Sequence, residues 1–315
     1  MSSVLVPPVI PGSDFAGVIV GAAPDAPFCK GDKVFGYCPN RWGRKRDLAA
    51  AQLSSEGAAY VDSIGGCLSE YMICPANMIT RMPEELNFQE AASLVTSGMT
   101  CLDILELFPQ QLNYNVVIIG ASGGVGSILT QMCAARGYRV WCVTREENFQ
   151  HCAKLGAHSV CDYTKQTWSK YFEPNLTLNE KPWVDAVIDC SPDGSGENWQ
   201  LAKTCLVKSG TYCSLTWQDP DAAESGSAGM FAGWQSAYRN VLSSWYFKYV
   251  QMAPSKEKLD TLVAMHAGGH FKPILDTKYG FEDVHEAFKK LMSKHTTGKL
   301  VVSFEEGGFS TENPE

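Results

Sequence analysis

The stretch Val116-Val-Ile-Ile-Gly-Ala-Ser-Gly-Gly-Val-Gly126 decides the fold of this 315-residue chain. A continuous apolar run, typical of a strand buried on both faces, leads directly into a glycine-rich turn. Apolar residues then recur at helical spacing, at Val125, Ile128, Leu129, Met132 and Cys133. Glycines in such a turn let the backbone approach a pyrophosphate, and the N–H groups at the helix start face the anion. The order of strand, turn and helix predicts a nucleotide site, with a tight turn that binds no ligand as the alternative.

Strand-like and helix-like segments alternate beyond this turn. Further strands are expected at residues 138–143, 159–163, 184–189 and 210–214, and a helix at 147–155. Alternation of this kind builds parallel βαβ units. The sequence therefore predicts an α/β fold with a doubly wound parallel sheet of the Rossmann type.

The two ends of the chain follow a different pattern. Residues 14–20, 33–37 and 68–74 have strand character, and residues 41–64 lack periodicity and indicate a long loop. Helices are expected at 256–266 and 283–293, and a late strand at 298–304. The acidic, glycine-rich tail at 305–315 is expected to be mobile.

Composition narrows the class of protein. A net charge of −8 disfavours binding to nucleic acids or membrane surfaces, since both are anionic. We see neither an apolar run of bilayer length nor a secretory signal at the start, so a soluble cytoplasmic protein without membrane insertion is expected. The twelve cysteines include no C-x-x-C pair, and several lie in apolar segments, which indicates reduced core thiols.

The end of the second strand bears on the choice of cofactor. An NAD-binding Rossmann domain usually places Asp or Glu there to accept the ribose hydroxyls, but this chain has Thr144-Arg145. A guanidinium could pair with a 2′-phosphate, so we predict NADPH as the cofactor. The neighbouring Glu146 and Glu147 weaken the prediction, although both could face solvent at a helix start. An ordinary surface arginine is the alternative for Arg145.

Several motifs along the chain resemble one family. They include Pro11-Gly-Ser-Asp-Phe-Ala-Gly17, Lys30-Gly-Asp-Lys-Val-Phe35, Gly65-Gly-Cys-Leu-Ser-Glu-Tyr71, the glycine-rich turn, and Gly298-Lys-Leu-Val-Val302. Together they resemble the medium-chain dehydrogenase/reductase superfamily, on its zinc-independent quinone oxidoreductase and enoyl reductase side. The resemblance implies a GroES-like substrate domain from residues 1–90 and 255–315, and a Rossmann NADP-binding domain from 91–254.

The resemblance also implies roles for individual residues. It places the turn at the pyrophosphate, Thr144, Arg145 and Asn148 near the 2′-phosphate, and Tyr163 beside the same ribose and adenine. Cys190 and Ser191 would border the adenosine, and Thr100, Leu215 and Thr216 would approach the nicotinamide. The complete set of expected cofactor contacts is Thr100, Gly120, Ala121, Ser122, Gly123, Gly124, Val125, Gly126, Thr144, Arg145, Asn148, Tyr163, Cys190, Ser191, Leu215 and Thr216.

Two departures from the family pattern matter. Zinc-dependent relatives carry a His-Glu pair where this chain has Ser13-Asp14, and a cysteine ligand near Thr96. Hydroxyl groups are poor zinc ligands, and the structural-zinc lobe would have only Cys38 and the distant Cys67, so no metal is expected. The family also begins with several strands before the segment at Pro11, which implies either a truncated chain or a diverged protein with a reduced substrate domain.

These observations predict an NADPH-dependent reductase that transfers hydride to a quinone or an activated C=C bond without zinc. The pattern names no catalytic residue. One alternative is alcohol or aldehyde chemistry, which needs a Lewis acid. Another is an NADP-binding pseudoenzyme or regulatory protein. A small-molecule substrate is expected, and a homodimer is possible.

Overall fold

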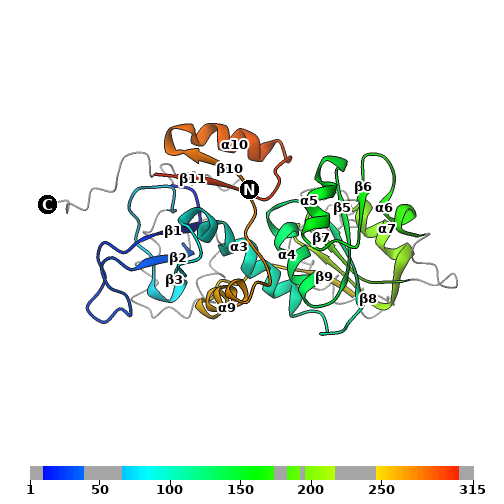
Figure 1. Cartoon of the computed structure of the whole chain (residues 1–315), viewed down its shortest axis with the longest axis horizontal. Coiled ribbons are helices and arrows are strands. Elements are labelled where there is room, and N and C mark those ends of the chain that lie inside the picture. The colour runs from blue at the N-terminus through cyan, green and yellow to red at the C-terminus, as the bar shows by residue number, and fades with distance from the viewer. Residues whose placement is uncertain (1–9, 39–65, 174–182, 192–195, 217–245, 305–315) are drawn as a thin grey trace, which may run out of the picture. The chain divides into compact units, whose positions relative to one another are not determined.

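The computed structural model describes residues 10–38, 66–173, 183–191, 196–216 and 246–304 (Figure 1). The chain divides into two compact units. The first comprises Met1–Met99, Met252–Gly269 and Pro273–Glu315, and the second comprises Thr100–Gln251 with His270–Lys272. The loop expected at 41–64 and the tail at 305–315 lie outside the described residues.

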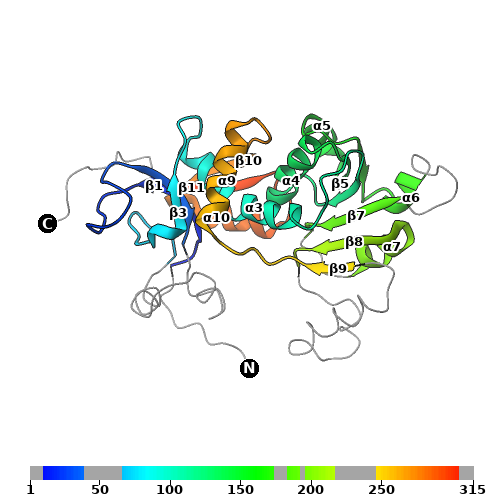
Figure 2. The ribbon, with the colours of Figure 1, turned by 90° about the horizontal axis from the view of Figure 1, so that it is seen from below.

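A six-stranded sheet forms the centre of the second unit, in the order β6-β5-β4-β7-β8-β9. Figure 2 labels β5, β7, β8 and β9 of this sheet. Every neighbouring pair of its strands is parallel. Since β5 and β7 flank β4, the order of the strands reverses at β4, which makes this the switch point of the sheet. The strands are β4 (Asn115–Ile119), β5 (Arg139–Thr144), β6 (Ser159–Asp162), β7 (Val184–Asp189), β8 (Leu206–Ser214) and β9 (Tyr246–Tyr249).

Helices cover both faces of this sheet. Trp168 of α6 and Trp199 of α7 pack in one apolar cluster with Trp141 of β5. Thr130 of α4 lies against the next residue of β5, with its hydroxyl 3.6 Å from the Cys142 thiol. Consecutive residues of a strand point to opposite faces, so α4 lies across the sheet from α6 and α7. The predicted doubly wound α/β sheet is confirmed. The helices are α4 (Gly124–Ala135), η2 (Glu146–Asn148), α5 (Phe149–Lys154), α6 (Trp168–Phe172) and α7 (Glu197–Cys205).

The first unit contains two small sheets. Strands β1 (Asp14–Val18), β2 (Lys33–Tyr37) and β3 (Ile79–Arg81) form an antiparallel sheet, and β10 (Leu275–Gly280) pairs in parallel with β11 (Lys299–Ser303). Around them lie η1 (Ala76–Met78), α9 (Lys256–Ala267), η4 (Phe281–Asp283) and α10 (Val284–Met292). The long helix α3 (Phe88–Leu105) begins in the first unit and ends in the second.

One predicted strand is wrong. Residues 68–74 form no strand: residues 69–71 are bends, and the backbone groups just before them bond to the segment before β1. Cys67 N–H donates to Gly12 O at 3.1 Å and Leu68 N–H to Pro11 O at 3.0 Å. The pattern that suggested a strand would place the side chains of Tyr71 and Ile73 on the buried face of a sheet, but both are exposed.

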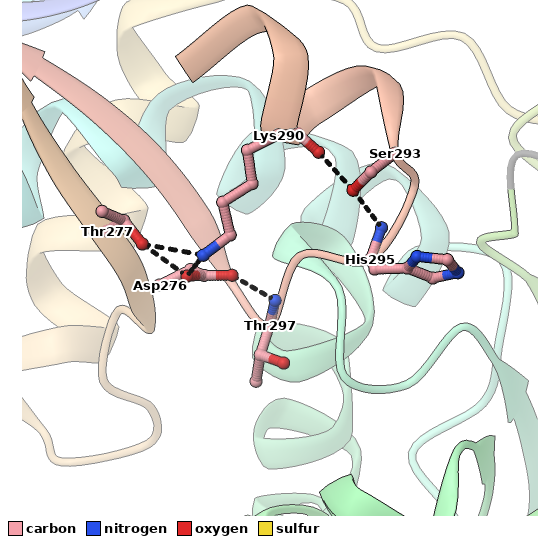
Figure 3. A network of polar contacts seen from close by, with 6 residues as sticks. All are labelled: Asp276, Thr277, Lys290, Ser293, His295 and Thr297. Carbon is pink, nitrogen blue, oxygen red and sulfur yellow. Dashed lines mark hydrogen bonds and ion pairs between the residues drawn. The ribbon is translucent and has the colours of Figure 1, made fainter. Parts of the chain in front are cut away.

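A polar network joins β10, α10 and the connection to β11 (Figure 3). The Asp276 carboxylate pairs with Lys290 Nζ and accepts the Thr297 N–H at 2.8 Å. Lys290 also donates to the Thr277 hydroxyl at 2.9 Å. Burial would raise the pKa of Asp276, but the bonds from Lys290, Thr277 and Thr297 outweigh it and hold this pKa below its ordinary 3.8.

We expect Lys290→Met to lower the free energy of unfolding by about 1–3 kcal/mol, because a largely buried carboxylate loses its charged partner. Glu286→Gln is the matched control, because it breaks an exposed pair with Lys289 on the same helix and should change stability by less than about 0.5 kcal/mol. Urea unfolding at neutral pH measures both. Equal losses in the two variants would contradict this account.

The same network predicts a pH dependence. The pKa of Asp276 is depressed in the folded state, so its contribution is present above pH 3.8 and is lost as the pH falls through the folded pKa. Asp276→Asn should therefore flatten the fall in stability as the pH is lowered below 3.8. A titration of unfolding free energy against pH, compared with the unmodified protein, measures this.

Candidate active site

The turn between β4 and α4 depends on its glycines in three different ways. Gly120 has φ +74°, in the left-handed region where glycine carries no steric penalty. A Cβ at Gly126 would lie 2.2 Å from the Gly120 carbonyl oxygen, so only glycine lets the helix pack so closely on the turn. Among the described residues, and apart from its chain neighbours, a Cβ at Gly123 would have one atom within 4 Å, the Gly120 carbonyl oxygen at 3.4 Å. The side of the turn at Gly123 is therefore open to an approaching ligand.

The start of α4 offers backbone donors beside this opening. Gly123 is the N-cap and provides no side-chain cap, and the first bond within the helix runs from Ser127 N–H to Gly123 O at 2.9 Å. The preceding N–H groups of the first turn thus have no acceptor inside the helix. Together with the helix dipole, they favour an anion at this position.

Three polar side chains connect the turn to the end of β5. The hydroxyls of Ser122 and Thr144, both buried, lie 2.8 Å apart. The Asn148 amide donates to Ser122 at 3.3 Å and to Thr144 at 3.4 Å. These contacts bring residues of two strand ends into one group, as expected for the carboxyl edge of a parallel sheet.

A basic side chain and an aromatic one meet at the ends of β5 and β6. Arg145 Nε donates to the Tyr163 hydroxyl at 3.1 Å, and this bond raises the pKa of Arg145 above its ordinary value. The Tyr163 side chain is half exposed, at 52%. A guanidinium with a phenol beside it, both open to solvent, can bind a phosphate.

Two of the nearby carboxylates have other partners, although Glu147 and Asp162 also contribute to the raised pKa of Arg145. Asp162 accepts the Thr164 hydroxyl at 2.7 Å, the Thr164 N–H at 2.8 Å and the Glu146 N–H at 3.2 Å. These bonds, that of the Thr164 hydroxyl above all, lower the pKa of Asp162. The Glu146 carboxylate pairs with Lys165. The Glu146 carboxylate, next to Arg145 in sequence, is therefore paired with a different cation, Lys165.

The ends of β7 and β8 complete this edge of the sheet. The Cys190–Ser191 turn lies against Gly120, where an added Cβ would be 3.2 Å from the Cys190 carbonyl. Burial raises the pKa of the Cys190 thiol well above its usual range, so this thiol stays protonated. Leu215 N–H donates to Asp189 O at 3.1 Å, and the Ser214 hydroxyl donates to Thr216 O at 2.8 Å.

The structure brings the predicted cofactor contacts that follow the ends of β4, β5, β6, β7 and β8 to the same edge of the sheet. Thr100, a buried residue of α3, precedes Cys101, whose thiol lies 3.5 Å from Val125 O at the start of α4. Sequence reasoning missed four polar residues that hold this edge in place: Asp162, Asp189, Asn198 and Tyr212. An aspartate that ends an apolar strand was the available signal for the first two.

Ser13, Asp14 and Thr96, the positions compared with zinc ligands, lie together in the first unit. The Asp14 carboxylate accepts the Thr96 N–H at 3.1 Å and also the Thr96 hydroxyl, and Ser13 Oγ lies 3.4 Å from it. Cys38 and Cys67 are far apart in sequence but close enough in space for the Cys38 thiol to affect the pKa of Cys67. Burial first, then Cys38 and Asp14, raise the pKa of Cys67 to about 12.

Within the described ranges, no three His, Cys, Asp or Glu side chains are grouped so as to hold a metal ion. Among the same residues, none of the helices has the length and apolar character needed to cross a bilayer.

Comparison with known families identifies the two parts of the chain. The model described as alcohol dehydrogenase GroES-like domain matches residues 2–84, and that described as zinc-binding dehydrogenase matches 155–302. An open parallel sheet with a glycine-rich turn at its switch point defines the class, a dinucleotide-fold oxidoreductase. The two models, together with the relatives below, support a quinone oxidoreductase-like protein of the medium-chain dehydrogenase/reductase superfamily, which confirms the resemblance.

Individual relatives agree with this assignment. The chain is 29% identical to the mitochondrial NAD(P)H oxidoreductase RTN4IP1 of Danio rerio, over 95% of this chain and 73% of that protein. It is 25% identical to the chloroplast envelope quinone oxidoreductase homolog of Arabidopsis thaliana, over 94% and 80%. The solved quinone oxidoreductase from Coxiella burnetii has the same fold, with a TM-score of 0.72 at 22% identity over 94% of this chain and 79% of that one.

Proposed function

We propose that this oxidoreductase uses NADPH to reduce a quinone or an activated C=C bond, without zinc. The observation that carries the choice of NADPH is the Arg145–Tyr163 pair at the ends of β5 and β6, where β5 ends in Thr144 rather than an acid. The names of the curated relatives, NAD(P)H oxidoreductase and quinone oxidoreductase homolog, support the reaction class.

The residues at the carboxyl edge fit a dinucleotide. The turn from Gly120 to Gly126 and the first N–H groups of α4 would hold the pyrophosphate. Arg145 and Tyr163 would hold the 2′-phosphate, and Ser122, Thr144 and Asn148 would line the ribose between the two phosphate sites. Cys190 and Ser191 would border the adenosine, and Thr100, Leu215 and Thr216 the nicotinamide end.

This arrangement assigns the protein a positioning task. When bound, NADPH supplies the hydride. The chain's own residues orient it against the substrate and keep water away from the reacting carbon. Negative charge that develops on the substrate oxygen requires hydrogen-bond donors in the absence of a Lewis acid.

Loss of NADPH absorbance with separate panels of quinones, enones and aldehydes tests the function. We expect oxidation of NADPH with a member of the first two panels, and slower oxidation of NADH. Tight NADPH binding without turnover on any panel would instead identify a cofactor-binding protein that lacks catalysis. Turnover of aldehydes alone would favour the alcohol dehydrogenase alternative.

We also predict that the purified protein contains no stoichiometric zinc, because Ser13 and Thr96 offer hydroxyls that are already bonded to Asp14. Elemental analysis measures the zinc content, and a chelator should leave the rate of NADPH oxidation unchanged. One bound zinc per chain, or loss of activity with the chelator, would contradict the metal-free proposal.

A further inference from the structure

A buried carboxylate lies at the carboxyl end of β7. Asp189 is 3% exposed and accepts four hydrogen bonds. Ser191 donates its N–H at 2.9 Å and its hydroxyl at 2.6 Å, both to Oδ1. The Asn198 amide at 3.0 Å and the Tyr212 hydroxyl at 2.7 Å donate to Oδ2. A buried carboxylate is costly unless donors of this kind surround it, so each donor is held firmly.

These donors come from three separate elements. Ser191 belongs to the turn after β7, Asn198 to α7 and Tyr212 to β8. The Asp189 carbonyl oxygen also accepts the Leu215 N–H, beyond the end of β8. One residue thus fixes both the Ser191 turn and the segment that begins at Leu215.

Movement of this turn would be transmitted to the glycine-rich loop. The Cys190 N–H donates to Ile119 O at 2.9 Å, and a Cβ on Gly120 would be 3.2 Å from both the Cys190 carbonyl and the Ser191 nitrogen. The two segments are in such close contact that the Ser191 turn cannot shift without displacing Gly120 or opening a gap beside it.

We propose that Asp189 is a positioning residue for the dinucleotide site, with Tyr212 and Asn198 as its supports. It acts through Ser191, Leu215 and Gly120 rather than by touching the cofactor. The inference rests on the proposed function, since it concerns the same NADPH site. It adds a second polar group to that site, between β4 and β7, distinct from the group formed by Ser122, Thr144 and Asn148.

Asp189→Asn tests the proposal with little change in volume. An amide has one acceptor oxygen, so its NH₂ group must face either the donors of Ser191 or those of Asn198 and Tyr212. We expect the Kd for NADPH to rise by about tenfold or more, the range for losing a charge-assisted bond. The fluorescence enhancement of bound NADPH should also fall, because the Leu215 segment moves.

Asp185→Asn is the matched control on the same strand. Asp185 lies near the amino end of β7 and accepts the Asn115 N–H at 2.7 Å, away from the carboxyl edge. Its NADPH affinity should stay within about twofold of the unmodified protein, since distant sites act independently. Both variants are measured well below their melting temperatures, so that affinity is separated from stability.

Tyr212→Phe keeps the inference testable if Asp189→Asn does not fold. It removes one donor to Oδ2 and retains the ring that packs against Trp199 and Phe247. We expect a rise in Kd of about threefold to tenfold, as for one net hydrogen bond. Unchanged affinity in a folded Asp189→Asn or Tyr212→Phe variant would overturn the positioning role. Failure of the unmodified protein to bind NADPH would instead overturn the proposed function.

Discussion

Gly123→Ala is expected to leave the protein folded and to weaken NADPH binding by about a hundredfold or more, the equivalent of two charge-assisted bonds. The backbone at Gly123, with φ −75° and ψ 178°, suits alanine, and the nearest atom to the new methyl group is 3.4 Å away. The methyl group would occupy the open side of the turn, where a pyrophosphate must approach.

Gly126→Ala gives the contrasting result. Its methyl group would meet Gly120 O at 2.2 Å and the Ala121 Cα at 2.8 Å, both backbone atoms that cannot rotate away. We expect lower stability by about 1–3 kcal/mol, together with loss of NADPH binding. Thermal melting and NADPH fluorescence titration separate the two effects.

Gly21→Ala, at an exposed position where no atom of the described residues lies within 4 Å of the added Cβ, should change neither quantity. If Gly123→Ala bound NADPH as tightly as the unmodified protein, the pyrophosphate could not lie on this turn.

Arg145→Gln should reduce the preference for NADPH over NADH. Loss of a charge-assisted contact to the 2′-phosphate corresponds to about 1.5–3 kcal/mol, or roughly a tenfold to hundredfold rise in the Kd for NADPH. NADH carries no 2′-phosphate, so its Kd should change little. Titration of both cofactors by nicotinamide fluorescence gives the ratio directly.

Arg139→Gln provides the control for net charge. Arg139 is exposed at the amino end of β5, the same strand that ends before Arg145. Its substitution should leave the affinities for NADPH and NADH unchanged. Raising the salt concentration should weaken NADPH binding in the unmodified protein more than in Arg145→Gln. Equal affinities for NADPH and NADH in the unmodified protein would remove the basis for this role of Arg145.

The parts of the fold that sequence predicted are those in which local pattern and burial agree. The run from Val116 to Ile119 is apolar because β4 has neighbours on both edges and helices on both faces. β10 was missed because Leu275–Gly280 has no apolar run, and its strand state arises from pairing with β11. β9, at the edge of the large sheet, was missed because Tyr246–Tyr249 is short and mostly exposed.

The site divides in the same way. The glycine-rich turn and Arg145 could be predicted because their signals lie within a few residues of a strand end. The bond between Arg145 and Tyr163 needs the register of β5 and β6, which places Thr144 opposite Asp162. Two partners of Asp189, Asn198 and Tyr212, lie 9 and 23 residues further along the chain, and only the packing of α7 and β8 brings them to its carboxylate.

The central place of β4 in the sheet has a consequence for folding. Its pairing with β5 joins strands separated by α4 alone, whereas its pairing with β7 spans α4, β5, α5, β6 and α6. Closing so long a loop is slow compared with forming a hairpin or a helix. The contact between the Gly120 turn and the Cys190–Ser191 turn needs both pairings, so a partly folded chain can possess the helices and half of the sheet and still lack it. Binding at this turn thus favours molecules in which β4 is paired on both edges, and a bound ligand stabilises the long-range β4–β7 pairing.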